Sequence, residues 1–363
     1  MAGHRKAILA RTVVIGALAL GLAACGRTEM SEYPLDALSP NGPIAEELDR
    51  LWQIVFPIAV GVFVLVEGLI LIAVLKFRDR GDGDLPHQVE GNTRLEILWT
   101  IIPAVILAGI AVPTVGTIFE LSEAPAKEER VEVEVVGKQF FWQFEYVNEG
   151  FFTANEMVVP TDTPVYLHLE GDPVYKGPDG REIQEASDLV LHSFWVPRLA
   201  GKTDFVPGAD RYMTLEASQE GTYLGNCAEF CGLSHANMRI RVRAVSQQEY
   251  EEWVAQQAKP AASPPEGPAA RGEEIFGANC VTCHAVKGHP DNVGQRTGPD
   301  LTHFNSRTRF AGAIFDVDDT QQLRAWIRNP PAEKPGAQMP PFGPDQISEG
   351  ELDALIQYLH TLD

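Results

Sequence analysis

The chain is poor in cysteine and in positive charge. Only 5 of its 363 residues are cysteine, and 29 lysine and arginine residues stand against 50 acidic ones, a net charge of -21. This acidic balance argues against nucleic acid as a partner and leaves basic proteins or small cations as plausible ones. No internal repeat is visible. At roughly 150 residues per domain, the length indicates two or three domains.

The few cysteines also exclude a framework of structural disulfides. Cys25 ends an apolar run, and the other four lie in pairs: two in the stretch NCAEFCGLSHANM (226–238) and two in CVTCH (280–284). Each pair belongs to a motif with a chemistry of its own, so no cysteine is left over for a disulfide. Cysteine in this chain therefore serves chemistry and anchoring.

Residues 1–24 have the pattern of a secretory signal, with basic residues, an apolar run and then small residues. The run ends in Leu-Ala-Ala-Cys, which resembles the lipobox of bacterial lipoproteins, whose cysteine is lipidated and becomes the mature N-terminus. We therefore expect lipidation at Cys25 and a short extracytoplasmic segment over 25–47. The alternative is a cysteine that happens to end an uncleaved anchor.

Two long apolar runs follow, over residues 51–77 and 95–119. Each can cross a hydrocarbon core of about 30 Å, so we expect a transmembrane hairpin over 48–122. Basic residues gather in the connecting loop and at its edges, while acids dominate the outer flanks. The positive-inside rule places this loop in the cytoplasm and everything after residue 120 outside. The basic residues are Lys76, Arg78, Arg80 and Arg94.

Residues 123–255 change to short β-rich runs, such as VEVEVVG and MRIRVRAV, broken by Gly, Pro and Asp turns. This pattern predicts a small antiparallel sandwich or barrel, closed by a short helix in SQQEYEEWVAQQ. The proline- and alanine-rich segment 256–270 can bury little, so we expect an extended linker there. Residues 271–363 have helical patterns and form a domain so small that a covalent cofactor would have to supply part of its core.

The first cysteine motif has the ligand chemistry of copper. Cys227, Cys231, His235 and Met238 combine thiolate, imidazole and thioether, which favour copper. Zinc is the rival, but a structural zinc site has no use for the methionine. Two thiolates also exceed the single one of a mononuclear blue-copper site. They suit a pair of copper ions bridged by two sulfurs.

The second motif predicts a covalent haem. In CVTCH, Cys280 and Cys283 form thioethers to the haem, and His284 becomes an axial ligand of the iron. We expect Met339, in the proline-flanked AQMPPF, to be the other axial ligand, because it is the only methionine of this domain. The rivals for that role are His289, His303 and His360.

These motifs carry a resemblance to known families. Residues from about 48 to 245 resemble subunit II of the haem-copper cytochrome c oxidases, and residues from about 270 to 363 resemble class I cytochromes c. The resemblance implies a cupredoxin sandwich with a dinuclear copper centre, CuA. It adds His192, in LHSFWVPRLAGKTDFVPG, and the backbone carbonyl of Glu229 to the four copper ligands. The Glu229 side chain would bind a magnesium ion shared with subunit I.

The implied protein is multi-domain: a transmembrane α-hairpin, a β-sandwich cupredoxin and a small all-α cytochrome c domain. Electrons would enter through its own haem c, pass to CuA and reach subunit I, which reduces oxygen to water and pumps protons. Expected partners are subunit I, subunit III, the bacterial plasma membrane and an upstream donor such as a cytochrome c or cytochrome bc complex. The alternatives are a free-standing membrane-anchored electron carrier and a nitrous oxide reductase. A quinol oxidase subunit would lack the copper ligands.

Further residues receive roles from the same resemblance. Glu96, in RLEILWTIIPAVIL, stands where the family admits protons to subunit I, although an acid at a helix start is commonly a partner of the helix dipole. Phe140 stands where the family usually has an exposed tryptophan for electron entry, and Trp142 keeps its place two residues on. The role of Glu67 in the first span stays open, and His168 is expected to be an ordinary structural histidine.

Overall fold

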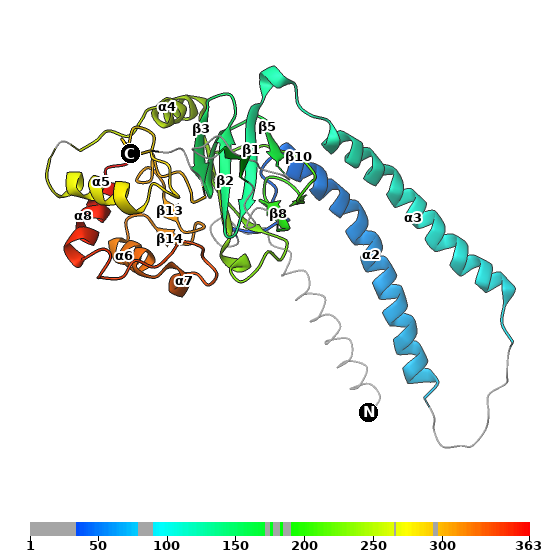
Figure 1. The fold of residues 1–363 in the computed structure, drawn as a ribbon. Coiled ribbons are helices and arrows are strands. Elements are labelled where there is room, and N and C mark those ends of the chain that lie inside the picture. Colours follow the sequence, from blue (N-terminus) through cyan, green and yellow to red (C-terminus); the bar gives the residue numbers. More distant parts are fainter. Residues whose placement is uncertain are drawn as a thin grey trace, which may run out of the picture.

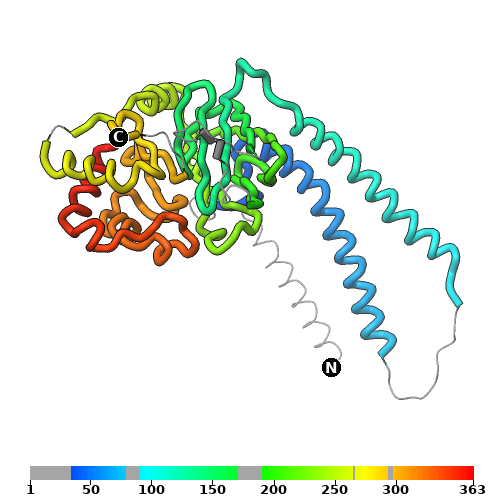
Figure 2. Tube along the Cα trace, in the orientation of Figure 1, coloured from blue at the N-terminus to red at the C-terminus, as the bar shows by residue number. Residues whose placement is uncertain are grey.

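The computed structural model describes most of the chain outside the N-terminus. The described residues are 34–78, 90–170, 175–176, 182–183, 190–264, 266–292 and 297–363. The predicted signal peptide, Cys25 and Arg80 lie outside them. A helical hairpin and a helical C-terminal domain lie on opposite sides of a β-sandwich (Figures 1 and 2).

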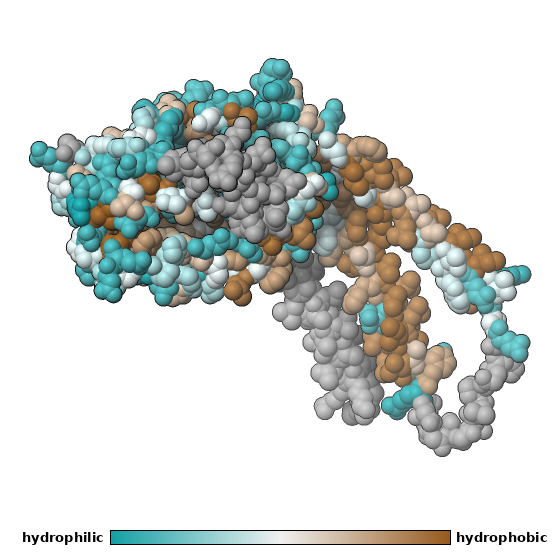
Figure 3. All heavy atoms as spheres, viewed as in Figure 1, coloured by the Kyte–Doolittle hydropathy of each residue, from teal (hydrophilic) through white to brown (hydrophobic). Residues whose placement is uncertain are grey.

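Two helices of the described residues are long and apolar enough to cross a membrane. They are α2 (Pro43–Lys76) and α3 (Thr93–Ser122), and the most apolar windows, with mean hydropathies of 2.9 and 2.3, bury none of their residues. Figure 3 shows their apolar surface extending away from the polar surface of the globular part. Apolar side chains that no protein covers require another apolar medium, which the bilayer supplies.

Helix α2 begins several residues before the predicted apolar run, because its first turn packs on the sandwich. Ala45 is buried, and Gly42, just before the helix, lies against the backbone of Glu216, where a β-carbon would come within 1.9 Å of the carbonyl oxygen. The Asn41 amide donates to the Arg198 carbonyl at 2.8 Å. The membrane anchor is therefore joined to the globular part by direct packing.

Residues 131–245 form two five-stranded sheets, with the orders β10-β5-β1-β2-β3 and β4-β12-β11-β8-β9. The first contains β1 (Val131–Lys138), β2 (Phe141–Tyr146), β3 (Phe151–Ala154), β5 (Val165–Leu169) and β10 (Arg211–Leu215). The second contains β4 (Glu156–Pro160), β8 (His192–Trp195), β9 (Thr203–Phe205), β11 (Gly221–Cys227) and β12 (Arg239–Val245). A separate short pair joins β6 (Tyr175–Lys176) to β7 (Glu182–Ile183).

The sequence pattern predicted an antiparallel sandwich, but two of the observed strand pairs are parallel. Strand β1 pairs in parallel with β5, with Val131 opposite Val165, and β12 pairs in parallel with β4, with Arg241 opposite Glu156. Alternation along a strand shows which face is buried but not the direction of its neighbour. A parallel neighbour requires a crossover connection, which a local pattern does not reveal.

Aromatic side chains fill the space between the sheets. Trp142, Phe144 and Tyr146 of β2 and Phe194 of β8 are fully buried. Trp142 meets Phe194 edge to face, with ring centroids 5.4 Å apart. Because Phe194 stands two residues after His192 on the short strand β8, this aromatic core also holds the strand that carries the predicted copper ligand.

The C-terminal part is helical, as predicted, with one short strand pair. Helix α4 (Gln247–Gln257) closes the sandwich; α5 (Pro268–Asn279), α6 (Thr320–Arg328), α7 (Pro330–Glu333) and α8 (Glu349–Leu359) follow, with β13 (Arg309–Phe310) and β14 (Phe315–Asp316) before α6. Helices α5 and α8 pack closely, because Gly272 has no side chain. A β-carbon there would lie 2.0 Å from the Ala354 carbonyl oxygen.

The predicted linker is held by hydrogen bonds in its described residues. The Ala261 amide donates to the Lys287 carbonyl at 2.7 Å, and the Lys287 amine donates to the Ala258 carbonyl at 2.9 Å. Nε2 of the buried His303 lies 3.1 Å from the Gln257 carbonyl oxygen. Composition predicts that such a segment buries little of its own surface, but it does not predict that another domain supplies hydrogen-bond partners.

Replacing Gly272 with alanine should destabilise the C-terminal domain, because the new methyl group overlaps α8. Overpacking of this kind costs roughly 1–3 kcal/mol, more than the roughly 0.5–1 kcal/mol that alanine contributes in a helix. The matched control is Gly350→Ala at the start of α8, where nothing lies within 4 Å. Thermal unfolding followed by circular dichroism should show a lower Tm for the first variant alone. Equal Tm values would contradict the close α5–α8 contact.

Candidate functional site

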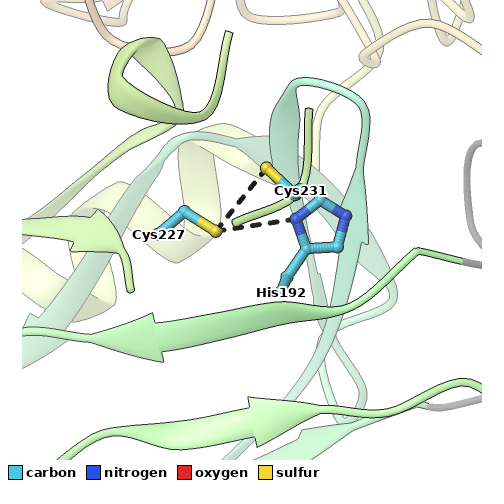
Figure 4. A group of neighbouring side chains, drawn as sticks. All are labelled: His192, Cys227 and Cys231. Carbon is cyan, nitrogen blue, oxygen red and sulfur yellow. Dashed lines mark hydrogen bonds between the residues drawn. The ribbon is translucent and has the colours of Figure 1, made fainter. Parts of the chain in front are cut away.

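The predicted copper ligands converge on one buried point. The sulfurs of Cys227 and Cys231 lie 3.8 Å apart, and Nδ1 of His192 lies 3.7 Å from the Cys227 sulfur (Figure 4). On the other side, the Cys231 sulfur lies 3.7 Å from Nδ1 of His235 and 3.9 Å from the sulfur of Met238. A disulfide would require about 2.05 Å, so the two sulfurs are separate ligands.

All of these residues except His192, which lies on β8, belong to one closed loop, which we call the copper loop (residues 226–238). Cys227 ends β11, and its amide donates to the Met238 carbonyl at 2.9 Å, so the two ends of the loop are joined. A 3-10 turn, η3 (His235–Asn237), brings the histidine back toward the sulfurs. The Glu229 carbonyl oxygen lies 3.2 Å from the Cys227 sulfur.

The two thiols share one hydrogen bond, so they do not ionise alike. The hydrogen bond with Cys231 lowers the pKa of Cys227 to about 3, against the opposing effect of burial. The same hydrogen bond, with burial, raises the pKa of Cys231. The pair thus holds one negative charge readily and a second only with a cation, as expected of two thiolates that bind metal.

The second set of predicted ligands surrounds a cavity of about 240 Å³. Cys280, Cys283, His284 and Met339 all line it, together with apolar side chains from α5, α6 and α8. Cys280 caps α5, and the backbone turns there, with the His284 amide donating to the Cys280 carbonyl at 2.9 Å. The cavity is enclosed by core side chains of the small domain, such as Phe276, Ile327 and Leu355, as the sequence predicts for a domain whose cofactor supplies part of the core.

The ring of His284 is oriented by its surroundings. Its Nδ1 lies 2.8 Å from the Pro299 carbonyl oxygen, which can only accept, so Nδ1 carries the proton and Nε2 is the nitrogen with a free lone pair. Burial lowers the pKa of His284, which favours this neutral form. Gly298 leaves room for the ring, because a β-carbon there would lie 2.5 Å from it.

The three rival histidines do not line the cavity. His289 lies 3.2 Å from the Glu273 carbonyl oxygen and packs on Phe276, while His303 and His360 contact oxygens of the C-terminal segment and of Asn305. Each has a structural partner. Among the four described candidates, only Met339 lines the cavity.

The cytochrome-like domain covers the turn between β1 and β2. Phe140 is 6% exposed and Trp142 is fully buried, so neither stands at an exposed tip of the kind that the resemblance implies. Phe140 and Phe141 belong to the sandwich, but they line the cavity of the C-terminal domain. The neighbouring Gln139 donates to the Cys231 carbonyl at 2.6 Å. Lys334, which no sequence signal marks, is buried at the same place, and burial lowers its pKa to about 7.

The remaining predicted residues lie apart from both sites. Glu96 is in the first turn of α3, where its Oε1 accepts from the Asn92 amide at 3.3 Å. Glu67 is exposed on α2. His168 stacks on Tyr212 and lies within 3.6 Å of the Glu134 carboxylate, which is the structural role expected of it.

Known protein families match adjoining parts of the chain. "Cytochrome C oxidase subunit II, transmembrane domain" matches residues 35–116, the periplasmic domain of the same subunit matches 131–245, and "Cytochrome c" matches 269–363. Cytochrome c oxidase subunit 2 of Alkalihalophilus pseudofirmus is 38% identical over 359 residues, which cover 97% of this chain and 96% of the relative. Its counterpart in Bacillus sp. (strain PS3) is 35% identical, and the match covers 96% of this chain and 96% of the relative. The counterpart in Bacillus subtilis is 31% identical, and the match covers 100% of this chain and 99% of the relative.

The chain belongs to the cytochrome c oxidase subunit II family. The predicted three-part fold, copper site and cytochrome c domain are confirmed. This subunit II is anchored by α2 and α3, carries its copper domain in the periplasm and transfers electrons to subunit I of a haem-copper terminal oxidase. Agreement along the whole chain decides for an oxidase subunit over a free carrier or a nitrous oxide reductase.

The copper loop predicts a metal content that can be measured. Elemental analysis of the intact subunit should find two copper ions for each haem; zinc, or one copper per haem, would contradict the dinuclear site. Cys227→Ser should lose the centre, because it removes one of the two sulfurs that would hold the copper pair. Met238→Leu should keep the copper but shift its absorption spectrum and potential, because the thioether lies 3.9 Å from only one sulfur.

Proposed function

We propose that this subunit takes in electrons through its own cytochrome domain and delivers them to the copper loop across the β1–β2 turn. One observation carries the proposal: Phe140 and Phe141 form part of the wall of the haem cavity, and Gln139 beside them is hydrogen-bonded to Cys231. The turn is thus in contact with both sites at once. When bound, the haem and the copper pair supply centres that each carry single electrons.

Named side chains would hold these groups. His192, Cys227, Cys231, His235 and Met238, with the Glu229 carbonyl, would bind the copper pair, since their donor atoms surround one buried point. Cys280 and Cys283 would form the thioethers, His284 would offer its Nε2 and Met339 would close the other side. The neutral form of His284 supports this role, because only an unprotonated nitrogen can bind iron.

The outer edge of the copper loop supports a contact with subunit I. Phe230 and Leu233 are 74% and 81% exposed, so two large apolar side chains are uncovered on the loop that carries Glu229. The Glu229 carboxylate is partly exposed there and would serve as a ligand of the shared magnesium ion. Subunit III and an upstream cytochrome c or cytochrome bc complex complete the proposed set of partners.

Electron transfer within the subunit should be intramolecular and nearly insensitive to salt. Residues 131–255 hold 9 basic and 20 acidic residues, and residues 271–363 hold 8 and 13, so net charges of -11 and -5 repel. Beyond about 8 Å this repulsion is screened at physiological salt. Flash reduction of the haem should be followed by copper reduction at a rate independent of protein concentration and flat with salt. A rate proportional to protein concentration would contradict the proposal.

Glu96 is proposed as the proton entrance toward subunit I, and its capping contact allows a discriminating pair of variants. Glutamine can keep the hydrogen bond to the Asn92 amide but cannot release a proton. Glu96→Gln should slow oxidase turnover by a factor on the order of ten, below the roughly 10²-fold effect of a group in the chemical step. Transfer from haem to copper should not change.

The control for Glu96→Gln is Glu96→Ala, which removes the cap as well. If turnover measured by oxygen consumption is normal in the glutamine variant and slow only in the alanine variant, Glu96 is a helix cap alone.

A further inference from the structure

The segment that carries Met339 is seated on the β1–β2 turn by one buried amine. We call residues 334–339 the Met339 segment. At its start, the Lys334 amine donates to the Phe140 carbonyl at 2.5 Å and to the Ala311 carbonyl at 2.9 Å. The first acceptor belongs to the cupredoxin and the second to the cytochrome domain. Lys334 is 3% exposed, so it joins the two domains out of contact with water.

The rest of the segment follows the same surface. The Ser234 hydroxyl of the copper loop donates to the Pro335 carbonyl at 2.6 Å. The Phe140 ring lies between the two loops: β-carbons built on Gly232 and Gly336 would stand 3.1 Å and 3.0 Å from it. One aromatic ring therefore touches both the loop of the copper ligands and the segment of the predicted iron ligand.

A third strip of backbone completes the contact. The Arg239 amide, just after the copper loop, donates to the Gly312 carbonyl at 3.1 Å. A β-carbon on Gly312 would lie 2.6 Å from the Asn237 carbonyl oxygen and 3.0 Å from that of Phe140. The two domains meet here backbone to backbone, and the Lys334 amine lies in the middle of the contact.

The burial of this amine distinguishes it from a polar contact at the water-exposed edge of the interface. Both protonation states of an amine donate hydrogen bonds, so its two contacts persist whether or not it is charged. Without it, the Phe140 carbonyl would lose a buried donor, and an acceptor left unpaired in a buried place is costly. A contact at the water-exposed edge would not carry this penalty, because water would replace the lost donor.

We propose that Lys334 is the positioning residue of the docked cytochrome domain: its amine ties the Met339 segment to the Phe140 carbonyl and so holds the haem cavity against the turn beside the copper loop. This deepens the proposed function and rests on it, because it names the contact that keeps the two sites in one arrangement. In this role Lys334 donates to two backbone carbonyls and is not itself a proposed ligand of copper or iron. It acts through the geometry that it imposes.

The test compares three variants of the full subunit in detergent. Lys334→Met keeps the length and apolar part of the side chain but removes the donor, and Ser234→Ala removes the neighbouring contact from the cupredoxin side. The matched control is Lys287→Met, since Lys287 belongs to the same domain and also donates to a backbone carbonyl, that of Ala258. Copper and haem contents and absorption spectra are recorded for each.

Hydrogen exchange measured by mass spectrometry reports docking without any catalysis. For Lys334→Met we expect exchange about tenfold faster in the peptides covering 139–142 and 334–339, the scale of one lost buried hydrogen bond. The exchange of α5 and α8 should stay at the wild-type rate. Ser234→Ala should also accelerate hydrogen exchange in these two peptides, whereas Lys287→Met should leave exchange in both at the wild-type rate. Transfer from haem to copper should slow severalfold in Lys334→Met and become sensitive to solvent viscosity, as for a step gated by redocking.

Unchanged exchange in both peptides of Lys334→Met would overturn the proposal, as would equal acceleration in Lys287→Met. Faster exchange throughout the cytochrome domain with loss of haem would also overturn it, because Lys334 would then be a folding residue. Failure of the proposed function looks different: the wild-type subunit would lack the copper pair or the methionine-bound haem, while the exchange pattern at the contact would still be that of a docked domain.

Discussion

The closure of the copper loop is the constraint on which the rest of the structure depends. Two sulfurs must lie a few ångströms apart without forming a bond, and each must face an imidazole. The amide of Cys227 bonded to the carbonyl of Met238 closes the loop, and the aromatic core around Trp142 holds the strand of His192 against it. The sandwich is therefore a rigid support for a short loop, which is how proteins generally hold a metal in a preset geometry.

The same loop determines where the cytochrome domain can sit. Both domains are acidic, so long-range attraction cannot orient them, and the orientation comes from short-range contacts. Besides the Lys334 contact, the Thr308 hydroxyl donates to Glu156, a buried carboxylate that also lies 3.7 Å from Arg241 and from Arg243. Each of these contacts requires a particular arrangement of donors and acceptors. They select one docked position in a way that net charge does not.

Glycine makes this arrangement possible at the points of closest approach. Gly312 lets two carbonyl groups of the cupredoxin come within reach of the cytochrome backbone, and Gly298 lets a carbonyl-bearing turn support the His284 ring. Side chains at these places would separate the groups that the contacts bring together. The membrane end follows the same rule, since Gly42 allows α2 to begin directly on the sandwich.

The sequence by itself determined the chemistry of this protein, because ligand type and spacing are local. The two cysteine pairs, the histidine close to each, the methionine of each domain's ligand set, the two apolar spans and the order of the domains could all be predicted from it. Only the tertiary structure decided what depends on distant partners. These features are the parallel pairings of β1 with β5 and of β12 with β4, the hydrogen bonds that hold the linker, the burial of Phe140 and the position of Lys334. None has a local sequence pattern, because each arises where segments far apart in the chain supply one another's donors, acceptors and apolar surface.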